Sequence, residues 1–126
     1  MMKRQKTGLR NMQNGMKGSV ISMFDSTAPC YMTSEVDRRV PQSILAIILE
    51  MLFALDLERG EQTDYLQVFE VLVDSKNERV IIKNRQEQTP LQKTMVFEQH
   101  IKLEESFTIW AMWQEDHTIL LFPSDY

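Results

Sequence analysis

The chain has 126 residues, of which 43 % are hydrophobic and 25 % charged, the usual balance of a globular protein with a core. Its single cysteine, Cys30, excludes an internal disulfide and a metal site built from several thiolates. The longest apolar run, Ile44 to Leu55, is far shorter than the roughly 20 residues that cross a bilayer. No apolar signal-peptide core follows the basic N-terminus, so we predict a cytoplasmic protein without a membrane partner.

Charge is distributed unevenly along the chain. Residues 1–22 contain five basic and no acidic side chains, whereas the remainder contains 9 basic and 18 acidic side chains and is therefore −9. Residues 1–22 also hold three of the four glycines and show no hydrophobic periodicity, which predicts a flexible basic tail before a single domain over 23–126. Two other interpretations stay open. The tail is a basic arm that touches nucleic acid or a membrane, or it lies upstream of a true start at Met23.

A strand and a long helix are predicted first. Residues Pro29–Val36 alternate weakly between polar and apolar side chains, which indicates a strand at the edge of a sheet. Pro41 suits the first position of a helix and Gly60 suits its stop, so we predict a helix from Pro41 to Leu57. Its apolar positions are Ile44, Leu45, Ile48, Leu49, Met51, Leu52, Phe53 and Leu55.

So apolar a helix has more hydrophobic surface than one sheet face can cover. One interpretation is a fully buried central helix in a monomer. The other is that its outer side, or the opposite face of the sheet, meets a partner. A homodimer is the simplest such arrangement, because most soluble oligomers are symmetric assemblies of one chain.

The stretch from Tyr65 to Val73 is predicted to be the central strand of the sheet. Its apolar residues are mostly β-branched or aromatic, and its two polar interruptions, Gln67 and Glu70, fall on opposite faces of a strand. The turn-forming residues 74–78 and the apolar centre of Arg79–Gln86 predict that a β-hairpin follows.

The C-terminal third is predicted to add three strands. Residues 91–101 alternate as an edge strand, although a helix stays open there, and Pro90 interrupts the ladder just before them. Phe107–Gln114 and Thr118–Phe122 form two further strands joined by a tight turn. The predicted class is therefore α+β, with a mostly antiparallel sheet of five or six strands packed against one long apolar helix.

Several short motifs between residues 31 and 126 resemble a known family. They are Tyr31-Met-Thr33, Val40-Pro41, Asp64-Tyr-Leu-Gln-Val-Phe69, Gln86-Glu87, Pro90, Thr118-Ile-Leu-Leu-Phe-Pro123 and Asp125-Tyr126. Together they resemble the bacterial family catalogued as domain of unknown function nine hundred and sixty, from low-GC Gram-positive bacteria and their mobile elements. Ser34-Glu35 replaces an Arg-Gly step of the family pattern, and a tryptophan near Leu52 is missing. The family has no established activity, so the resemblance implies a fold and no mechanism.

The sequence contains no pattern typical of an enzyme. The only glycine after residue 22 is Gly60, so no glycine-rich loop can hold a phosphate. The run Glu115-Asp116-His117 lies on one turn and cannot easily converge on one ion, and Glu104 and Glu105 point to opposite faces. Cys30 has no nearby base. We therefore predict no catalytic residue, no cofactor, no metal and no small-molecule ligand.

Two groups of residues are candidates for interaction. Trp110 and Trp113 lie on opposite faces of their predicted strand, so at least one is in the core and the other can anchor a partner. Arg79, Lys83 and Arg85 align on one face of the second hairpin strand, either as a basic row or as the charged face of a solvated edge strand.

We predict a non-enzymatic protein-interaction or regulatory accessory module that binds a protein partner or a second copy of itself. The alternative is a nucleic-acid-associated protein that uses the basic N-terminal arm together with the basic row. The net charge of −9 on residues 23–126 disfavours that alternative, because it repels phosphate.

Overall fold

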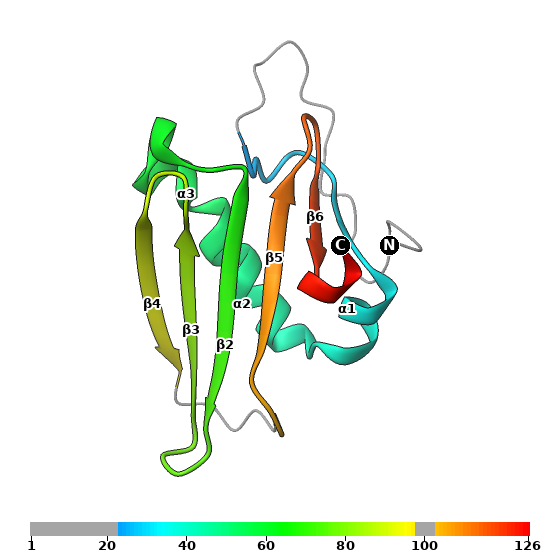
Figure 1. Ribbon diagram of the computed structural model, residues 1–126, viewed down its shortest axis with the longest axis vertical. Coiled ribbons are helices and arrows are strands. Elements are labelled where there is room, and N and C mark those ends of the chain that lie inside the picture. Colours follow the sequence, from blue (N-terminus) through cyan, green and yellow to red (C-terminus); the bar gives the residue numbers. More distant parts are fainter. Residues whose placement is uncertain (1–22, 98–102) are drawn as a thin grey trace.

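Six strands form one sheet in the computed structural model, which describes residues 23–97 and 103–126 (Figure 1). Their bounds are β1 Cys30–Met32, β2 Leu66–Asp74, β3 Arg79–Gln86, β4 Leu91–Phe97, β5 Phe107–Trp113 and β6 Thr118–Leu121. They are arranged in the order β1-β6-β5-β2-β3-β4, and all neighbours are antiparallel except β1 and β6. The predicted α+β class with a mostly antiparallel sheet is confirmed.

The predicted tail, residues 1–22, and the end of the predicted strand 91–101 lie outside the described residues. The part of that strand which is described, β4, forms one edge of the sheet as expected and is extended rather than helical.

Strand β2 is the interior strand that its sequence predicts. It pairs with β5 on one side and with β3 on the other, and Phe69 and Val71 are completely buried. The β2–β3 hairpin closes at the Asp74–Arg79 pair, and Glu78 in its turn has a positive φ of 53°. The predicted hairpin is confirmed.

The first predicted strand is too long. Strand β1 is an edge strand, as expected, but it ends at Met32, and the helix α1 (Ser34–Arg39) follows. The hydroxyl of Thr33 accepts a hydrogen bond from the backbone N–H of Val36 at 3.2 Å and so caps the helix. Glu35 and Asp37 in the first turn also favour a helix start. These local interactions outweigh the weak alternation of residues 33–36.

The predicted long helix is interrupted. Helix α2 covers Gln42–Phe53, Ala54 is its C-cap, and the short helix α3 (Leu55–Glu58) and a 3₁₀ turn (Gly60–Gln62) lead into β2. Twelve residues span about 18 Å, and the bend after Ala54 turns the chain back toward the sheet. Leu57 consequently lies outside the core and is 93 % exposed.

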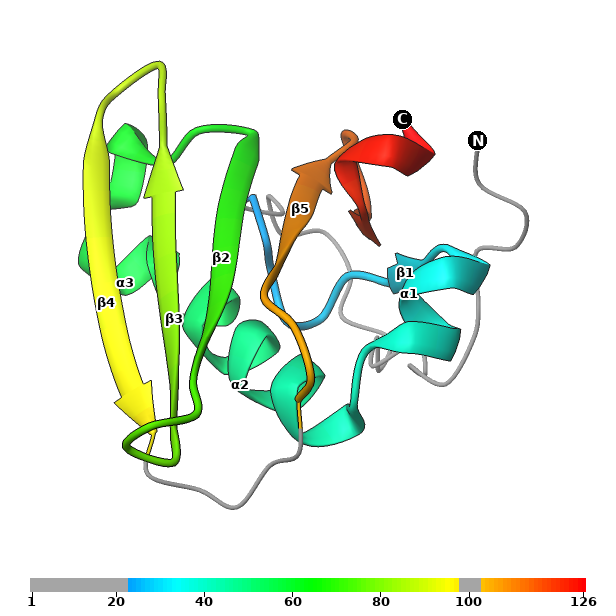
Figure 2. The ribbon, with the colours of Figure 1, turned by 60° about the horizontal axis from the view of Figure 1, so that its bottom comes forward.

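Helix α2 covers one face of the sheet only (Figures 1 and 2). Its buried side packs into a core whose main members are Ile44, Ile48, Met51, Leu52, Leu55, Phe69, Val71, Ile82, Ile109 and Leu120. Gln42, Ser43, Ala46 and Glu50 on its other side are exposed, so the interpretation of a fully buried helix is wrong. No helix in the described part of the chain is long and apolar enough to span a membrane.

Candidate interaction surface

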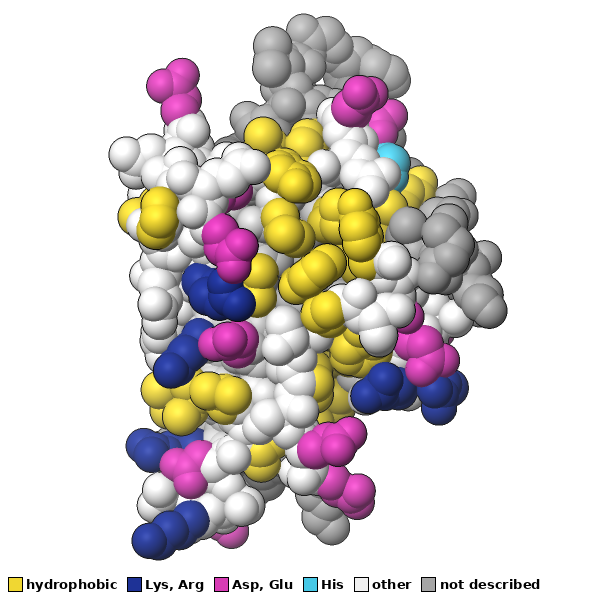
Figure 3. Space-filling view, viewed as in Figure 1, with side chains coloured by type: hydrophobic (Ala, Val, Ile, Leu, Met, Phe, Trp, Pro, Cys, Tyr) yellow, Lys and Arg dark blue, Asp and Glu magenta, His cyan; other side chains and the backbone are white. Residues whose placement is uncertain are grey.

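The face of the sheet that points away from α2 is rich in apolar side chains, and we call it the outer face. Side chains alternate between the two faces of a strand, and the strand register places these residues together. Its apolar members are Tyr31, Leu66, Val68, Leu72, Ile81, Val96, Trp110, Met112, Ile119 and Leu121. Val68, Ile119 and Leu121 are buried among their neighbours, whereas the other seven are partly or fully exposed. Figure 3 shows hydrophobic side chains gathered over β2, β5 and β6 on this face. No described helix covers it.

Aromatic residues contribute to the outer face on β5, on the edge strand β1 and at the C-terminus. Trp110, a candidate anchor in the sequence, is partly exposed and meets the ring of Tyr126 edge-on, with 5.8 Å between ring centroids. Tyr126 is 79 % exposed, because it follows the 3₁₀ turn at the C-terminus. Tyr31 and His117 form a similar pair at 5.5 Å. Such side chains offer large apolar area with little rotamer freedom to lose on binding.

Trp113, the other candidate anchor, lies on the face that packs against α2. Its ring meets that of Phe24 at 6.2 Å between centroids, and it packs against the core while partly buried. The two tryptophans are therefore divided between the faces, and only Trp110 belongs to the outer face.

The basic row lies along β3 beside this apolar surface, and carboxylates accompany it. Arg79 binds Asp74 at 2.9 Å, and Arg85 contacts Glu87 at 2.8 Å and Glu70 at 3.7 Å. Lys and Arg side chains alternate with Asp and Glu in this region of Figure 3. Strand β3 lies between β2 and β4, so the explanation of the row as a charged edge strand is wrong.

These ion pairs leave the row with little net positive charge. Lys83 is the member for which no carboxylate lies within 4 Å among the described residues, and Glu70 is its cross-strand neighbour. Because phosphate recognition depends on several unpaired cations, the row is poorly suited to nucleic acid.

A buried cluster of amides, which the sequence analysis did not single out, lies on the opposite face near α3. Gln67, Asn84 and Gln86 are at most 3 % exposed. The amide nitrogen of Gln67 donates to the side-chain oxygen of Gln86 at 2.7 Å, and that of Asn84 donates to the oxygen of Gln67 at 3.1 Å. We call these three residues the amide cluster.

The amide cluster fixes the entry into β2. The side-chain oxygen of Gln86 accepts the backbone N–H of Asp64 at 3.1 Å, and Arg59 donates to both Gln67 and Gln86. The carboxylate of Asp64 accepts the N–H groups of Gln88 and Thr89 from the β3–β4 turn. Burial lowers the pKa of Arg59, although the nearby Glu58 and Asp64 carboxylates oppose that shift.

The amide cluster contains neutral side chains and no nucleophile, so its chemistry is structural. A signal for it exists in the sequence. Gln67 and Gln86 are polar residues in the two strands of one hairpin. If the pairing that starts at Asp74 and Arg79 continues along both strands, Gln67 lies opposite Gln86.

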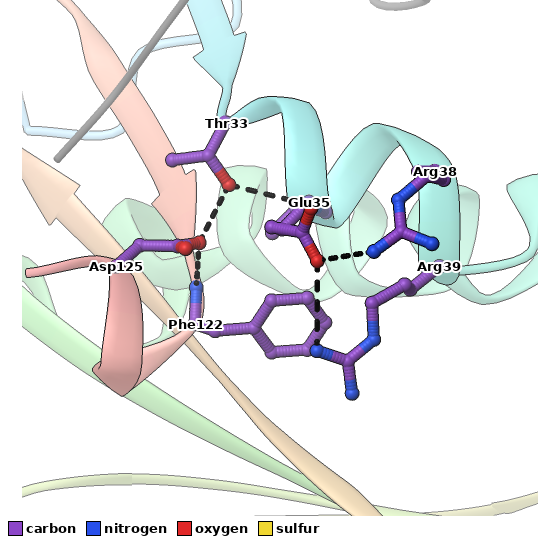
Figure 4. A network of polar contacts seen from close by, with 7 residues as sticks. Thr33, Glu35, Arg38, Arg39, Phe122 and Asp125 are labelled. Atoms are coloured by element: carbon purple, nitrogen blue, oxygen red, sulfur yellow. Dashed lines mark hydrogen bonds and ion pairs between the residues drawn. The ribbon is translucent and has the colours of Figure 1, made fainter.

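A second polar network ties α1 to the C-terminus (Figure 4). The hydroxyl of Thr33 donates to the carboxylate of Asp125 at 2.7 Å, and the same carboxylate oxygen accepts the backbone N–H of Phe122 at 3.0 Å. The guanidinium of Arg39 lies 4.4 Å from the centroid of the Phe122 ring, while Glu35 binds both Arg38 and Arg39. The network holds the C-terminal turn, and therefore Tyr126, beside the outer face.

The described side chains that the sequence offered as a nucleophile, as metal ligands or as an acid–base pair do not form one site. Cys30 is buried, and burial raises the pKa of its thiol to about 12, so it stays protonated at neutral pH. Nδ1 of His117 lies 2.7 Å from the carboxylate of Asp116 on the turn between β5 and β6. Within residues 23–97 and 103–126, no three His, Cys, Asp or Glu side chains could hold a metal ion. Glu104 and Glu105 are exposed.

Comparison with known proteins identifies the fold and no activity. No protein-family model matches the sequence, and no curated protein matches it either. A solved structure of a protein of unknown function from Enterococcus faecalis is similar to this chain, with a TM-score of 0.71 and 19 % sequence identity. The alignment covers 84 % of this chain and 97 % of that chain. At this identity the similarity shows a shared fold alone.

Proposed function

We propose that this chain is a non-enzymatic protein-interaction module of the cytoplasm, with a regulatory accessory role, and that its outer face binds the partner. The observation that supports this most is the apolar, aromatic outer face, which no described helix covers (Figure 3). Its partly exposed side chains, Trp110 and Met112 among them, supply the apolar area, and a large exposed apolar patch is uncommon on proteins that bind nothing. We also propose membership of the family that the sequence motifs resemble.

The charges around the outer face indicate the partner's chemistry. Residues 23–126 carry a net charge of −9, and the exposed Glu115 and Asp116 lie at one end of the face, on the β5–β6 turn. A matching partner presents apolar side chains to Trp110 and Met112 and basic side chains at the rim. Complementary charge of this sort speeds association and selects the partner more than it adds affinity.

Affinity capture with matched variants tests the proposal. The tagged chain is compared with Met112→Glu and Tyr126→Ala, which alter the outer face, and with Leu57→Ser, which alters an exposed apolar residue of α3. Lysate of the native host is treated with nuclease, and thermal unfolding checks that each variant is folded. We expect wild type and Leu57→Ser to capture one defined protein. The captured amount of that protein should be at least about tenfold lower with either outer-face variant, as for a buried hot spot.

Two results contradict the proposal. One is a partner that binds all four proteins equally, because the outer face would then take no part. The other is the loss of every partner on nuclease treatment, which favours the nucleic-acid alternative.

A further inference from the structure

Strand β4 forms one edge of the sheet, and this edge is seven residues long. Strand β4 pairs with β3 over its whole length, from Leu91 to Phe97, and no described segment pairs with its other side. Such an edge presents backbone N–H and C=O groups that can accept another strand. The opposite edge, β1, has only three residues and is protected by its shortness.

The usual protection of an edge strand is weak at β4. Its only charged side chain is Lys93, and that ammonium group is bound to the carboxylate of Glu58. Proline, which blocks pairing, occurs at position 90, before the strand begins. Thr94 and Val96 are exposed, so one face of the edge is uncharged and accessible.

An apolar groove of about 270 Å³ runs beside this edge, between β4 and α2. It is lined by Ile47, Glu50, Met51, Ala54, Lys93, Met95 and Phe97. A strand that adds to β4 directs every second side chain toward this groove, because side chains alternate. The edge therefore offers backbone pairing and apolar contact at the same place, the combination used in recognition by strand addition.

We infer that the strand which adds to β4 is β4 of a second copy, running antiparallel about a twofold axis at Thr94. This register pairs all seven residues, with Leu91 opposite Phe97 of the second copy and Lys93 opposite Met95 of the second copy. The apolar Leu91 and Phe97 then face each other at both ends, and no like charges meet. An axis at Lys93 would instead oppose two ammonium groups, which is destabilising.

The dimer continues the sheet across both copies and places both α2 helices on one side. The two grooves then meet, so the partly buried Ile47, Met95 and Phe97 of both copies line one shared apolar region. Glu50, for which no cation lies within 4 Å among the described residues, lines the groove together with Met95. Lys93 of the second copy lies opposite Met95 in this register, so it brings a positive charge near Glu50 while it stays paired with Glu58 of its own copy. The two outer faces stay free on the other side, so this inference goes beyond the proposed function and makes the module bivalent.

Site-specific disulfide formation tests the register. Thr94→Cys places two cysteines opposite each other at the axis, within the 4.4–6.8 Å between Cα atoms that a disulfide spans. Gln92→Cys and Val96→Cys are matched controls. In this register position 92 lies opposite position 96 of the second copy, so the two cysteines of either control dimer are about 14 Å apart. The native Cys30 is buried and does not compete.

We expect mild oxidation of the purified full-length chain to crosslink the Thr94→Cys variant at least about tenfold faster than either control, as read by non-reducing electrophoresis. Equal rates for all three variants overturn the register. Light scattering of wild type should give the mass of a dimer at high micromolar concentration. A monomer mass there overturns the inference, and it is the result expected if β4 binds another protein's strand instead.

A charge variant adds an independent measurement. In Thr94→Glu the new carboxylate lies beside its cross-strand neighbour Lys83 on β3 of its own copy, which supports the folded chain. At the axis of the dimer the same carboxylate meets its equivalent in the second copy. We expect the dissociation constant to rise about fivefold, the scale for like charges set directly opposite. An unchanged constant contradicts the axis at Thr94. Met112→Glu alters the outer face and not β4, so it should leave dimerisation intact. Failure of the outer-face proposal can therefore be distinguished from failure of the dimer.

Discussion

Replacement of Gln86 by alanine should strongly destabilise the fold. The side chain of Gln86 makes five hydrogen bonds, three as acceptor and two as donor. In Gln86→Ala, Arg59 and Gln67 keep other partners, because Arg59 still donates to Gln67 and Gln67 still donates to the carbonyl of Asp64. The backbone N–H of Asp64, however, is left buried without its acceptor.

The magnitude follows from these losses. An unpaired buried N–H costs about 1–3 kcal/mol, and the carbonyls of Gln62 and Thr89 also lose their donor. We therefore expect the free energy of unfolding to fall by about 3 kcal/mol. For a chain of this size that corresponds to a decrease in Tm of about 10 °C.

Urea denaturation followed by tryptophan fluorescence measures this change. Gln114→Ala is the matched control, because Gln114 is exposed at the end of β5 and its loss should change the free energy of unfolding by at most about 0.5 kcal/mol. If Gln86→Ala and Gln114→Ala are equally stable, the amide cluster does not hold the entry into β2, and our account of that region is refuted.

Two further predictions concern ionisable groups. Because the pKa of the buried Cys30 thiol is raised to about 12, a thiol reagent at pH 8 should leave it unmodified in the native chain and modify it after unfolding; rapid native modification would contradict its burial. Hydrogen bonds from Asn77 and Arg79 lower the pKa of Asp74, so its stabilising effect should be present above the unfolded-state pKa and be lost as pH falls through the folded value. Carboxyl NMR should show that pKa rising in Arg79→Gln, and no rise would exclude the Arg79 interaction.

The sheet was largely predictable, because its signals are local. The apolar run of β2 and the turn residues 75–78 determine a hairpin and an interior position. The errors arose where a local interaction competes with a pattern. Thr33 caps a helix and so ends β1 after three residues, and the chain bends at Ala54 although the apolar spacing continues to Leu57.

The sites were less predictable, because they depend on which residues meet across the sheet. Trp110 and Trp113 could be assigned to opposite faces, but not to the outer and inner face, since both neighbourhoods are apolar. The motif residues Gln67, Gln86 and Asp125 belong to buried or part-buried hydrogen-bond networks. The resemblance therefore rests partly on residues that maintain the fold.

The most direct test of the outer face is hydroxyl-radical footprinting of the complex with the captured partner. Our account predicts that the oxidation rates of Trp110, Met112 and Tyr126 fall at least about fivefold on binding, because buried side chains lose contact with solvent. The rate for Leu57 on α3 should not change. Protection of Leu57 with unchanged rates at Trp110, Met112 and Tyr126 would contradict the proposal that the outer face binds the partner.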